Sequence, residues 1–250
     1  MKSTTTCSPR PTIRRCIPFP RVNSSRVATL ALAQLFLFAV TGAAPAAWKR
    51  HIIDDASRGA DGARIADDDG DGLPDIVTGW EQGGVVRVCL NPGPTKVKQN
   101  WSTVTVGKAG NVEDAVLVDL DNDGAIDVVS CSEGKTRAVS VHWAPKKSAD
   151  FLDKTAWRTE RLPAAADRMM WMFALQLQLD ARHGLDIVAG GKGAQAAIGW
   201  FEAPAAARRL DDWQWHKLRP VGWLMSILPS DMDNDGDIDI VFSDRKGERT

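Results

Sequence analysis

An acidic string that recurs at a nearly constant interval constrains the fold of this chain more than any other feature. The strings IADDDGDGLPDIV, LVDLDNDGAIDVV and PSDMDNDGDIDIV place Asp75, Asp127 and Asp239 at equivalent positions, and the degenerate copy LQLQLDARHGLDIV places Asp186 between them. The steps between these four residues are 52, 59 and 53. Self-similarity at such a period indicates a repeat protein in which each repeat is one supersecondary unit.

Two other features keep the same period. Short apolar segments end at Pro92, Pro145 and Pro204, and further segments open at Trp48, Trp101, Trp157 and Trp213. Each repeat therefore contains four short apolar segments, which in the second repeat are residues 114–118, 127–131, 138–143 and 157–162. Segments of five or six residues that are rich in Val and Ile are too short for stable helices and are typical of strands.

Four antiparallel strands in a unit of about 50 residues match the plan of a propeller blade. The sequence therefore predicts an all-β fold, a β-propeller of four-stranded antiparallel blades with about three and a half blades present. A β-solenoid is the alternative, although its coils are usually shorter than this period.

The acidic strings follow the pattern DxDxDGxxD, in which alternate side chains of a curled loop can point at one centre. Glycine at position 6 permits the sharp turn that presents the backbone carbonyl of position 7. The expected ligands are Asp67, Asp69, Asp71, Leu73 and Asp75 in the first loop, Asp119, Asp121, Asp123, Ala125 and Asp127 in the second, and Asp231, Asp233, Asp235, Asp237 and Asp239 in the last. Oxygen ligands without nitrogen or sulfur favour Ca²⁺, so we expect about three calcium sites.

The degenerate copy offers Gln178, Asp180, Arg182 and Asp186 at the corresponding positions. We expect Arg182 to supply the positive charge there and the loop to bind no metal. An EF-hand would require Glu at position 12, where the three acidic strings have Thr78, Ser130 and Phe242. A solvated turn remains an alternative for each loop, because Asp, Asn and Gly are ordinary turn residues.

The DxDxDGxxD loops followed by Ile-Val or Val-Val resemble the FG-GAP/VCBS repeats, whose best-known members are the calcium-binding blades of integrin α-subunits. The resemblance covers residues 48–250, although the FG and GAP signatures themselves are poorly kept. It implies a seven-bladed ring of the exported bacterial type, incomplete at the C-terminal side of this chain. It also implies that each acidic loop joins the innermost strand of a blade to the next strand, and that the segment opening at Trp48 is an outer strand that closes the ring.

The N-terminal segment has the pattern of an export signal. Basic residues precede an apolar core at residues 27–40 and a run of small residues that ends in A-x-A, so we expect a signal peptide over 1–46 and the propeller repeats over 47–250. The predicted location is secreted, periplasmic or at the cell surface. Membrane attachment is expected only if the leader is uncleaved and acts as an anchor. Cys89 and Cys131 then remain, either as buried free thiols or as a disulfide.

The charge distribution argues against nucleic acid as a partner. Six basic residues lie in the leader: Lys2, Arg10, Arg14, Arg15, Arg21 and Arg26. Removing these six from the 31 Lys and Arg leaves 25 against 32 Asp and Glu, a balance near −7 with no basic stripe. The sequence also contains no GxSxG, GxxxxGK or HExxH motif.

One further stretch is a candidate ligand surface. Its residues precede the innermost strands of two successive repeats: Arg168, Met169, Met170, Trp171, Trp223 and Met225. Aromatic and Met side chains near a propeller axis suit an adaptable binding surface, and core packing is the alternative. We therefore expect a calcium-binding, non-catalytic binding or adhesion module with a protein or carbohydrate ligand. The alternative is the propeller domain of an enzyme that acts on carbohydrate or a small metabolite.

Overall fold

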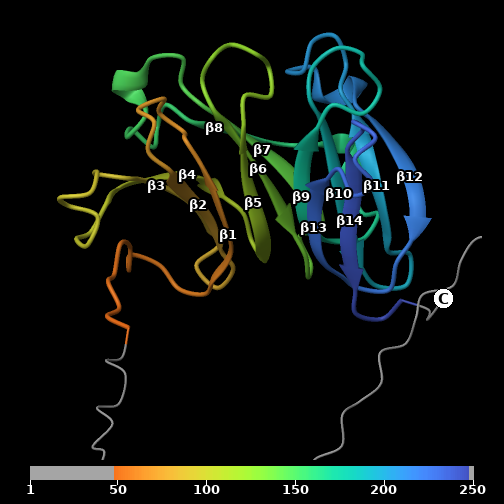
Figure 1. Cartoon of the computed structure of the whole chain (residues 1–250), viewed down its shortest axis with the longest axis horizontal. Coiled ribbons are helices and arrows are strands. Elements are labelled where there is room, and N and C mark those ends of the chain that lie inside the picture. Colours follow the sequence, from red (N-terminus) through yellow and green to blue (C-terminus); the bar gives the residue numbers. More distant parts are fainter. Residues whose placement is uncertain (1–47, 248–250) are drawn as a thin grey trace, which may run out of the picture. The chain divides into compact units, whose positions relative to one another are not determined.

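The structure, a computed structural model, describes residues 48–247. The expected signal peptide lies outside the described residues. Fourteen strands and three single-turn 3-10 helices make up this part of the chain (Figure 1). The strands are β1 Ala60–Ala66, β2 Asp75–Trp80, β3 Val85–Leu90, β4 Ser102–Lys108, β5 Val112–Val118, β6 Asp127–Ser132, β7 Ala138–Trp143, β8 Arg158–Arg161, β9 Met170–Leu177, β10 Asp186–Lys192, β11 Ala197–Glu202, β12 Gln214–Pro220, β13 Leu224–Ser230 and β14 Asp239–Asp244. The 3-10 helices are η1 Ser148–Asp150, η2 Pro163–Ala165 and η3 Leu210–Asp212.

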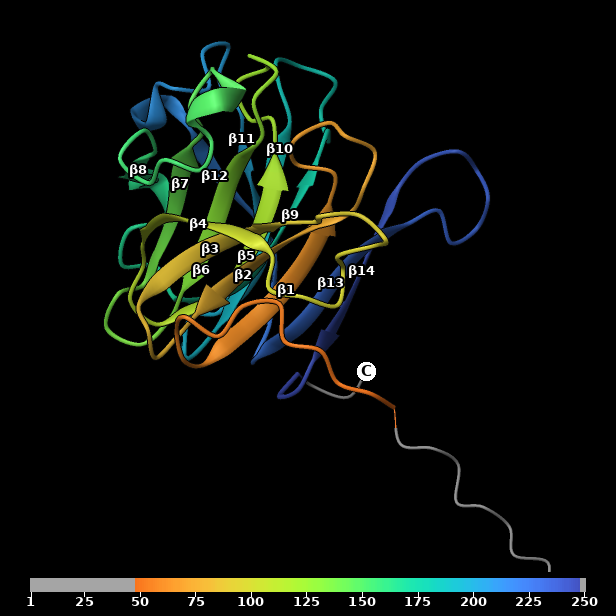
Figure 2. The ribbon, with the colours of Figure 1, turned by 90° about the vertical axis from the view of Figure 1, so that its left-hand side faces the viewer.

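Consecutive strands pair in antiparallel order to form the blades. Strands β1–β4, β5–β8 and β9–β12 form three four-stranded sheets, and β13 pairs with β14 in a two-stranded sheet. We call these blades 1, 2 and 3 and the half-blade. The first strand of each blade contacts the first strand of the next, so β1, β5, β9 and β13 are the innermost strands (Figure 2). The prediction of an all-β propeller with three and a half blades is confirmed, whereas a seven-bladed ring stays a prediction.

The four expected strands of the second repeat appear as β5, β6, β7 and β8. The prediction of an outer strand that opens at Trp48 is wrong, because residues 48–59 contain no strand and Trp48 is 97% exposed. Instead, the Ile53 carbonyl accepts a hydrogen bond from the Trp101 amide at 2.9 Å, which holds the segment against blade 1.

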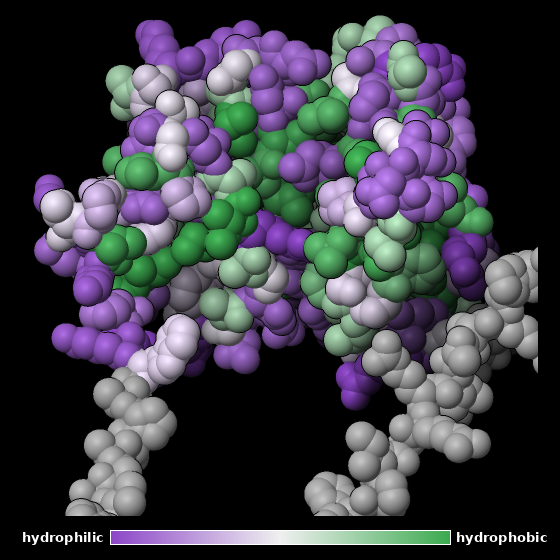
Figure 3. Space-filling view, in the orientation of Figure 1, coloured by the Kyte–Doolittle hydropathy of each residue, from purple (hydrophilic) through white to green (hydrophobic). Residues whose placement is uncertain are grey.

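Three hydrophobic cores fill the spaces between neighbouring blades. One lies between blades 1 and 2, one between blades 2 and 3, and one between blade 3 and the half-blade. Because blade 2 is covered on both faces, every residue of β6 and β7 is buried, the polar ones included. The half-blade is covered on one face, and hydrophobic residues remain exposed on the other, including Leu228 and Val241 (Figure 3).

The periodic tryptophans anchor the loops that lead into the fourth strands. The indole nitrogens of Trp101, Trp157 and Trp213 donate to backbone carbonyls four or six residues earlier, at 2.9–3.0 Å. Trp157 and Trp213 are buried. An amphipathic ring whose N–H finds a partner can stay buried, which explains why this residue type recurs at that point of each blade.

A buried carboxylate connects three blades at their innermost strands. Asp114 on β5 accepts two hydrogen bonds from the Arg64 guanidinium on β1, at 2.8 and 2.9 Å, and a third from the Ala174 amide on β9 at 3.2 Å. The Asp114 side chain is fully buried. Three hydrogen bonds, two of them from a charged guanidinium, offset the cost of burying this carboxylate.

The buried His142, on β7 of blade 2, has a structural role. His142 is fully buried, with its ring nitrogens 2.9 Å from Ser130 Oγ and 2.8 Å from Thr159 Oγ1, and burial lowers its pKa to about 4. The imidazole is therefore neutral and has no contact with solvent.

Cys89 and Cys131 are free, buried thiols, as one of the two alternatives for them predicts. Within residues 48–247, no helix has the length and apolarity needed to span a bilayer.

Candidate functional site

The loops of the three acidic strings fold through one shared set of hydrogen bonds. Loop 1 joins β1 to β2, loop 2 joins β5 to β6, and loop 4 joins β13 to β14. The position-1 carboxylate accepts from the position-6 amide at 3.0, 3.1 and 3.2 Å respectively. The position-3 carboxylate accepts from the position-5 amide, and the position-5 carboxylate accepts from the position-7 amide. The chain therefore curls around its own alternate carboxylates, as the spacing predicts.

Two positions of each curl have left-handed backbone. At position 6 the φ angles of Gly72, Gly124 and Gly236 are 83°, 87° and 97°, a region that glycine enters without a steric penalty. Position 4 is also left-handed, and its residues are Gly70, Asn122 and Asn234. Glycine and asparagine are the residue types that tolerate this conformation best. The sequence analysis used only the position-6 glycine.

The aspartate at position 9 connects each loop to the rest of its blade. One oxygen of Asp75 accepts from the position-2 amide at 2.9 Å, and the other accepts from the Asn91 amide, just after β3, at 2.7 Å. Asp127 makes the same two contacts in blade 2, and Asp186 makes them in blade 3. This residue therefore has a structural role even in the degenerate loop, a role that the sequence analysis did not assign.

Carboxylate oxygens come together in loops 1, 2 and 4. In each loop three oxygen atoms, one from each of three aspartates, lie within 4.8 Å of one another. The sets are Asp67, Asp69 and Asp71 in loop 1, Asp119, Asp121 and Asp127 in loop 2, and Asp231, Asp233 and Asp239 in loop 4. The structure thus unites the position-1 and position-3 side chains in every loop, and adds position 5 in loop 1 but position 9 in loops 2 and 4. Such a set of hard oxygen donors fits a divalent cation.

The remaining expected ligands lie around these sets. Asp75, Asp123 and Asp235 belong to the same loops but lie outside the three-oxygen groups. The position-7 residues are Leu73, Ala125 and Asp237. Their backbone amides donate to the position-5 carboxylates at 2.8–3.0 Å.

Loop 2 has a basic partner that the sequence analysis missed. The Arg208 guanidinium, from the segment between β11 and β12, pairs with Asp121 and lies 3.3 Å from Asp123. It also stacks over the Trp143 ring, with its carbon 4.6 Å from the ring centroid. Lys146 adds a second contact to Asp123 at 3.4 Å. A cation that enters loop 2 must therefore compete with Arg208.

Burial raises the pKa of two loop carboxyls. The pKa of Asp127 rises to about 7 through burial, with the Ala144 amide opposing the shift and the Asp121 carboxylate adding to it. The pKa of Asp68, at position 2 of loop 1, rises to about 8 through burial and the nearby Asp75 carboxylate. Without a cation, these groups hold protons that ordinary aspartates lose near pH 4.

The degenerate loop between β9 and β10 keeps the curl but has an amide and a basic side chain where the other loops have converging carboxylates. The Gln178 amide nitrogen donates to the carbonyls of Arg182 and Gly184, at 2.9 and 2.6 Å, which are positions 5 and 7 of the loop. Arg182 pairs with Asp180 at 2.8 Å, as expected for its charge. The Gln178 contribution was not anticipated, because an amide that donates inward can be recognised only once the loop is folded.

The candidate ligand surface separates into different environments. Trp171 does not belong to it, because the side chain is fully buried between blades 2 and 3 and packs on Phe201 and Trp215. Met170 and Trp223 line one cavity of about 500 Å³, and Arg168 and Met169 line another of about 400 Å³. Met225 is partly exposed and lines neither of these cavities.

A second acidic group lies at the opposite ends of the strands from the loops. Oxygens of Glu81, Glu113 and Glu133 lie within 4.8 Å of one another. The Lys192 ammonium pairs with Glu133 and lies 3.8 Å from Glu113. It also lies 4.6 Å from the centroid of the Trp223 ring. A basic side chain from blade 3 therefore already partly neutralises this group.

Fold and loops together define an antiparallel β-propeller protein with DxDxDG-type loops between the first and second strands of its blades. A family comparison agrees with this class. Residues 67–130, from loop 1 into β6, match the family model described as FG-GAP-like repeat. These residues therefore carry an FG-GAP-like repeat, as the sequence predicts. No curated protein matches the chain.

Proposed function

We propose that this chain is an exported, calcium-binding propeller that acts as a non-catalytic binding or adhesion module for a protein or carbohydrate ligand. The FG-GAP-like repeat over residues 67–130 supports the propeller and its binding role. The observation that carries the calcium assignment is that three loops, in three different blades, each bring three carboxylate oxygens within 4.8 Å of one another.

Electrostatics favours a cation in these loops. Like charges at such short separations repel unless a cation or protons neutralise them. Ca²⁺ accepts six to eight oxygen ligands in flexible geometry, whereas Mg²⁺ demands a near-ideal octahedron. Carboxylates, backbone carbonyls and water can all contribute to such a flexible shell, so loops that differ in which aspartates converge suit Ca²⁺ better.

Thermal melting tests the calcium assignment. An ion that binds only the folded state adds about 2.7 kcal/mol per site at 100 times its dissociation constant. We expect millimolar Ca²⁺ to raise the Tm of residues 47–250, EDTA to reverse the rise, and Mg²⁺ to give a smaller one. An identical Tm in EDTA and in Ca²⁺ would refute the calcium assignment.

A matched pair of variants tests which loops bind the ion. Asp233 and Asp180 both occupy position 3, in loop 4 and in the degenerate loop respectively. We expect Asp233→Asn to lower the calcium bound in equilibrium dialysis by about one ion, and Asp180→Asn to leave it unchanged. Equal losses in both variants would contradict the assignment.

Export is the part of the proposal that rests on the leader pattern in residues 1–46. Expression of the whole chain in a bacterium, followed by N-terminal sequencing of the protein outside the cytoplasm, tests it. We expect the mature chain to begin at Ala47. A chain that stays in the cytoplasm with its N-terminus intact would refute export.

A further inference from the structure

Asp68 is an acidic residue at a loop position where the other blades have apolar ones. Position 2 is Leu120 in loop 2, Leu179 in the degenerate loop and Met232 in loop 4. Leu120 is fully buried, and Asp68 is only 5% exposed. Neither carboxylate oxygen of Asp68 has a hydrogen-bond partner among the described residues. Blade 1 therefore has a buried carboxylate at the position where the other three loops have Leu or Met.

The backbone of the loop holds Asp68 in place. Its amide donates to Asp75 at 2.9 Å, and Asp75 in turn accepts from the Asn91 amide at 2.7 Å. The Asp68 side chain is separate from the three-oxygen group of loop 1, which consists of Asp67, Asp69 and Asp71. Because position 2 lies between the inward-pointing positions 1 and 3, Asp68 is left over when the other carboxylates are assigned to a metal.

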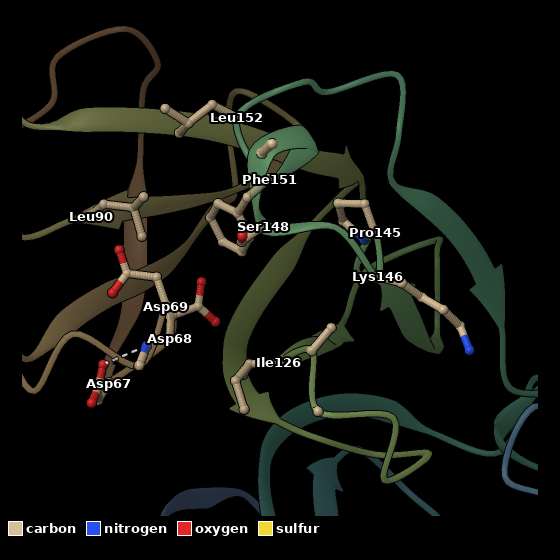
Figure 4. A pocket seen from close by; sticks show the side chains of 14 residues that line it. Asp67, Asp68, Asp69, Leu90, Ile126, Pro145, Lys146, Ser148, Phe151 and Leu152 are labelled. Carbon is tan, nitrogen blue, oxygen red and sulfur yellow. Dashed lines mark hydrogen bonds between the residues drawn. The ribbon is translucent and has the colours of Figure 1, made fainter.

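A cavity between blades 1 and 2 adjoins this carboxylate. Its volume is about 420 Å³, and Asp68 lines it together with the apolar side chains of Leu90, Ile126, Phe151 and Leu152. Figure 4 shows the aspartates of loop 1 across the cavity from Ile126, with Leu90 and Phe151 beside them. The cavity is of the size that holds small molecules.

The basic side chain that lines the cavity, Lys146, is already paired with an aspartate of loop 2. Its ammonium lies 3.4 Å from Asp123, and its side chain points away from the loop 1 aspartates in Figure 4. The cavity thus combines the unpartnered carboxylate of Asp68, and the neighbouring Asp67 and Asp69 of loop 1, with an otherwise largely apolar wall.

We infer that this cavity binds an organic cation, a primary amine with an apolar body, whose ammonium group pairs with Asp68. A buried charge is costly unless it is paired, and an ammonium supplies three donors to a carboxylate that accepts only. The apolar walls would bury the body of the ligand. The inference deepens the proposed binding role and rests on it, and the residue that pairs with the ligand, Asp68, lies outside the three-oxygen group of loop 1.

Benzylamine is a suitable probe, with benzyl alcohol and benzoate as neutral and anionic molecules of similar shape. Binding would be measured by isothermal titration calorimetry on residues 47–250 in excess Ca²⁺, so that the loops are saturated. We expect millimolar or tighter binding of benzylamine, at least tenfold weaker binding of benzyl alcohol, and no binding of benzoate.

Two variants test the role of Asp68. Asp68→Asn keeps the shape and removes the charge, and Asp68→Leu installs the residue that loop 2 carries. We expect both to weaken benzylamine binding at least tenfold. Because an unpartnered carboxylate opposes folding, Asp68→Leu is also expected to raise the Tm without ligand, whereas a structurally required aspartate would lower it.

The outcomes separate this inference from the proposed function. Equal binding of benzylamine and benzyl alcohol, or unchanged binding in Asp68→Asn, would overturn the cationic site. Loss of one bound calcium in Asp68→Asn would also overturn it, by making Asp68 a metal ligand. If benzylamine fails to bind while calcium still raises the Tm, the cation site is wrong and the calcium assignment stands. If calcium has no effect but benzylamine binds through Asp68, the reverse holds.

Discussion

Replacing Arg208 with alanine should make loop 2 bind calcium more tightly. Arg208 occupies the loop from outside, pairing with Asp121 and approaching Asp123 while it stacks over Trp143. An entering ion must displace these contacts from the carboxylates. In loops 1 and 4, no Arg or Lys pairs with the aspartates of the three-oxygen groups within the described residues, so loop 2 should be the weakest of the three sites in the wild-type chain.

The size of the effect follows from the exposure of the pair. The Arg208 side chain is 43% exposed, so solvent screens its ion pairs. Such a pair contributes about 0.2–1 kcal/mol, and an exposed cation–π contact adds about 0.5–1 kcal/mol. Displacing Arg208 therefore costs roughly 1–2 kcal/mol at most, and each 1.4 kcal/mol is a factor of about ten in Kd. We expect the Kd of loop 2 to fall by up to about thirtyfold in Arg208→Ala.

Calcium titration calorimetry at low ionic strength measures this directly, with Arg209→Ala as the matched control. Arg209 is the next residue in the same segment, and it pairs with Asp212 instead, at 2.9 Å. Its removal changes the net charge by the same amount without freeing loop 2. If both variants shift calcium affinity equally, general electrostatics explains the change. An unchanged or weaker affinity in Arg208→Ala would refute the competition.

Two further predictions concern stability. Asp186→Ala should destabilise the fold by roughly 2–4 kcal/mol, because the Leu179 and Ala203 amides lose their shared acceptor, while the number of bound calcium ions stays constant. Urea unfolding and equilibrium dialysis check the two halves of this prediction, and loss of an ion would contradict it. In EDTA, stability should fall as the pH rises from about 4 to 8, because the folded state keeps Asp68 and Asp127 protonated up to pKa values of about 8 and 7, whereas the unfolded chain releases these protons near pH 4. A higher Tm at pH 8 than at pH 5 in EDTA would contradict this assignment, and saturating Ca²⁺ should reduce the pH dependence.

The parts of the structure that could be predicted from the sequence are those that depend on local residue patterns. The strands and the curl of each loop depend on residues close in sequence, so the order of Val, Ile, Asp and Gly suffices to place them. The second repeat shows this, because β5 to β8 lie where the apolar segments of the sequence are.

Long-range contacts explain the rest. Arg208 lies 87 residues after Asp121, and the two meet only because blade 3 packs beside blade 2. Likewise, nothing in the order of residues shows that Trp171 turns into a core or that Asp68 ends beside a cavity. The sequence also does not show that the two carboxylate oxygens of Asp75 have different partners. One accepts from the Asp68 amide within its own loop, and the other accepts from the Asn91 amide just after β3.

The three-blade contact of Asp114 implies that the blades are not interchangeable. At the equivalent position blade 1 has Gly62, where an added Cβ would lie 2.8 Å from Asp114 Oδ1, and blade 3 has Phe173, whose ring centroid lies 5.8 Å from the Arg64 guanidinium carbon. Each of these three residues fits only the neighbours it has. In a simple repeat array, stability is a sum of units and nearest-neighbour interfaces, and any unit could be moved or copied. Here one carboxylate of blade 2 accepts hydrogen bonds from both flanking blades, so its burial requires those two neighbours. A chain with the same blades in another order would leave this buried carboxylate without its partners.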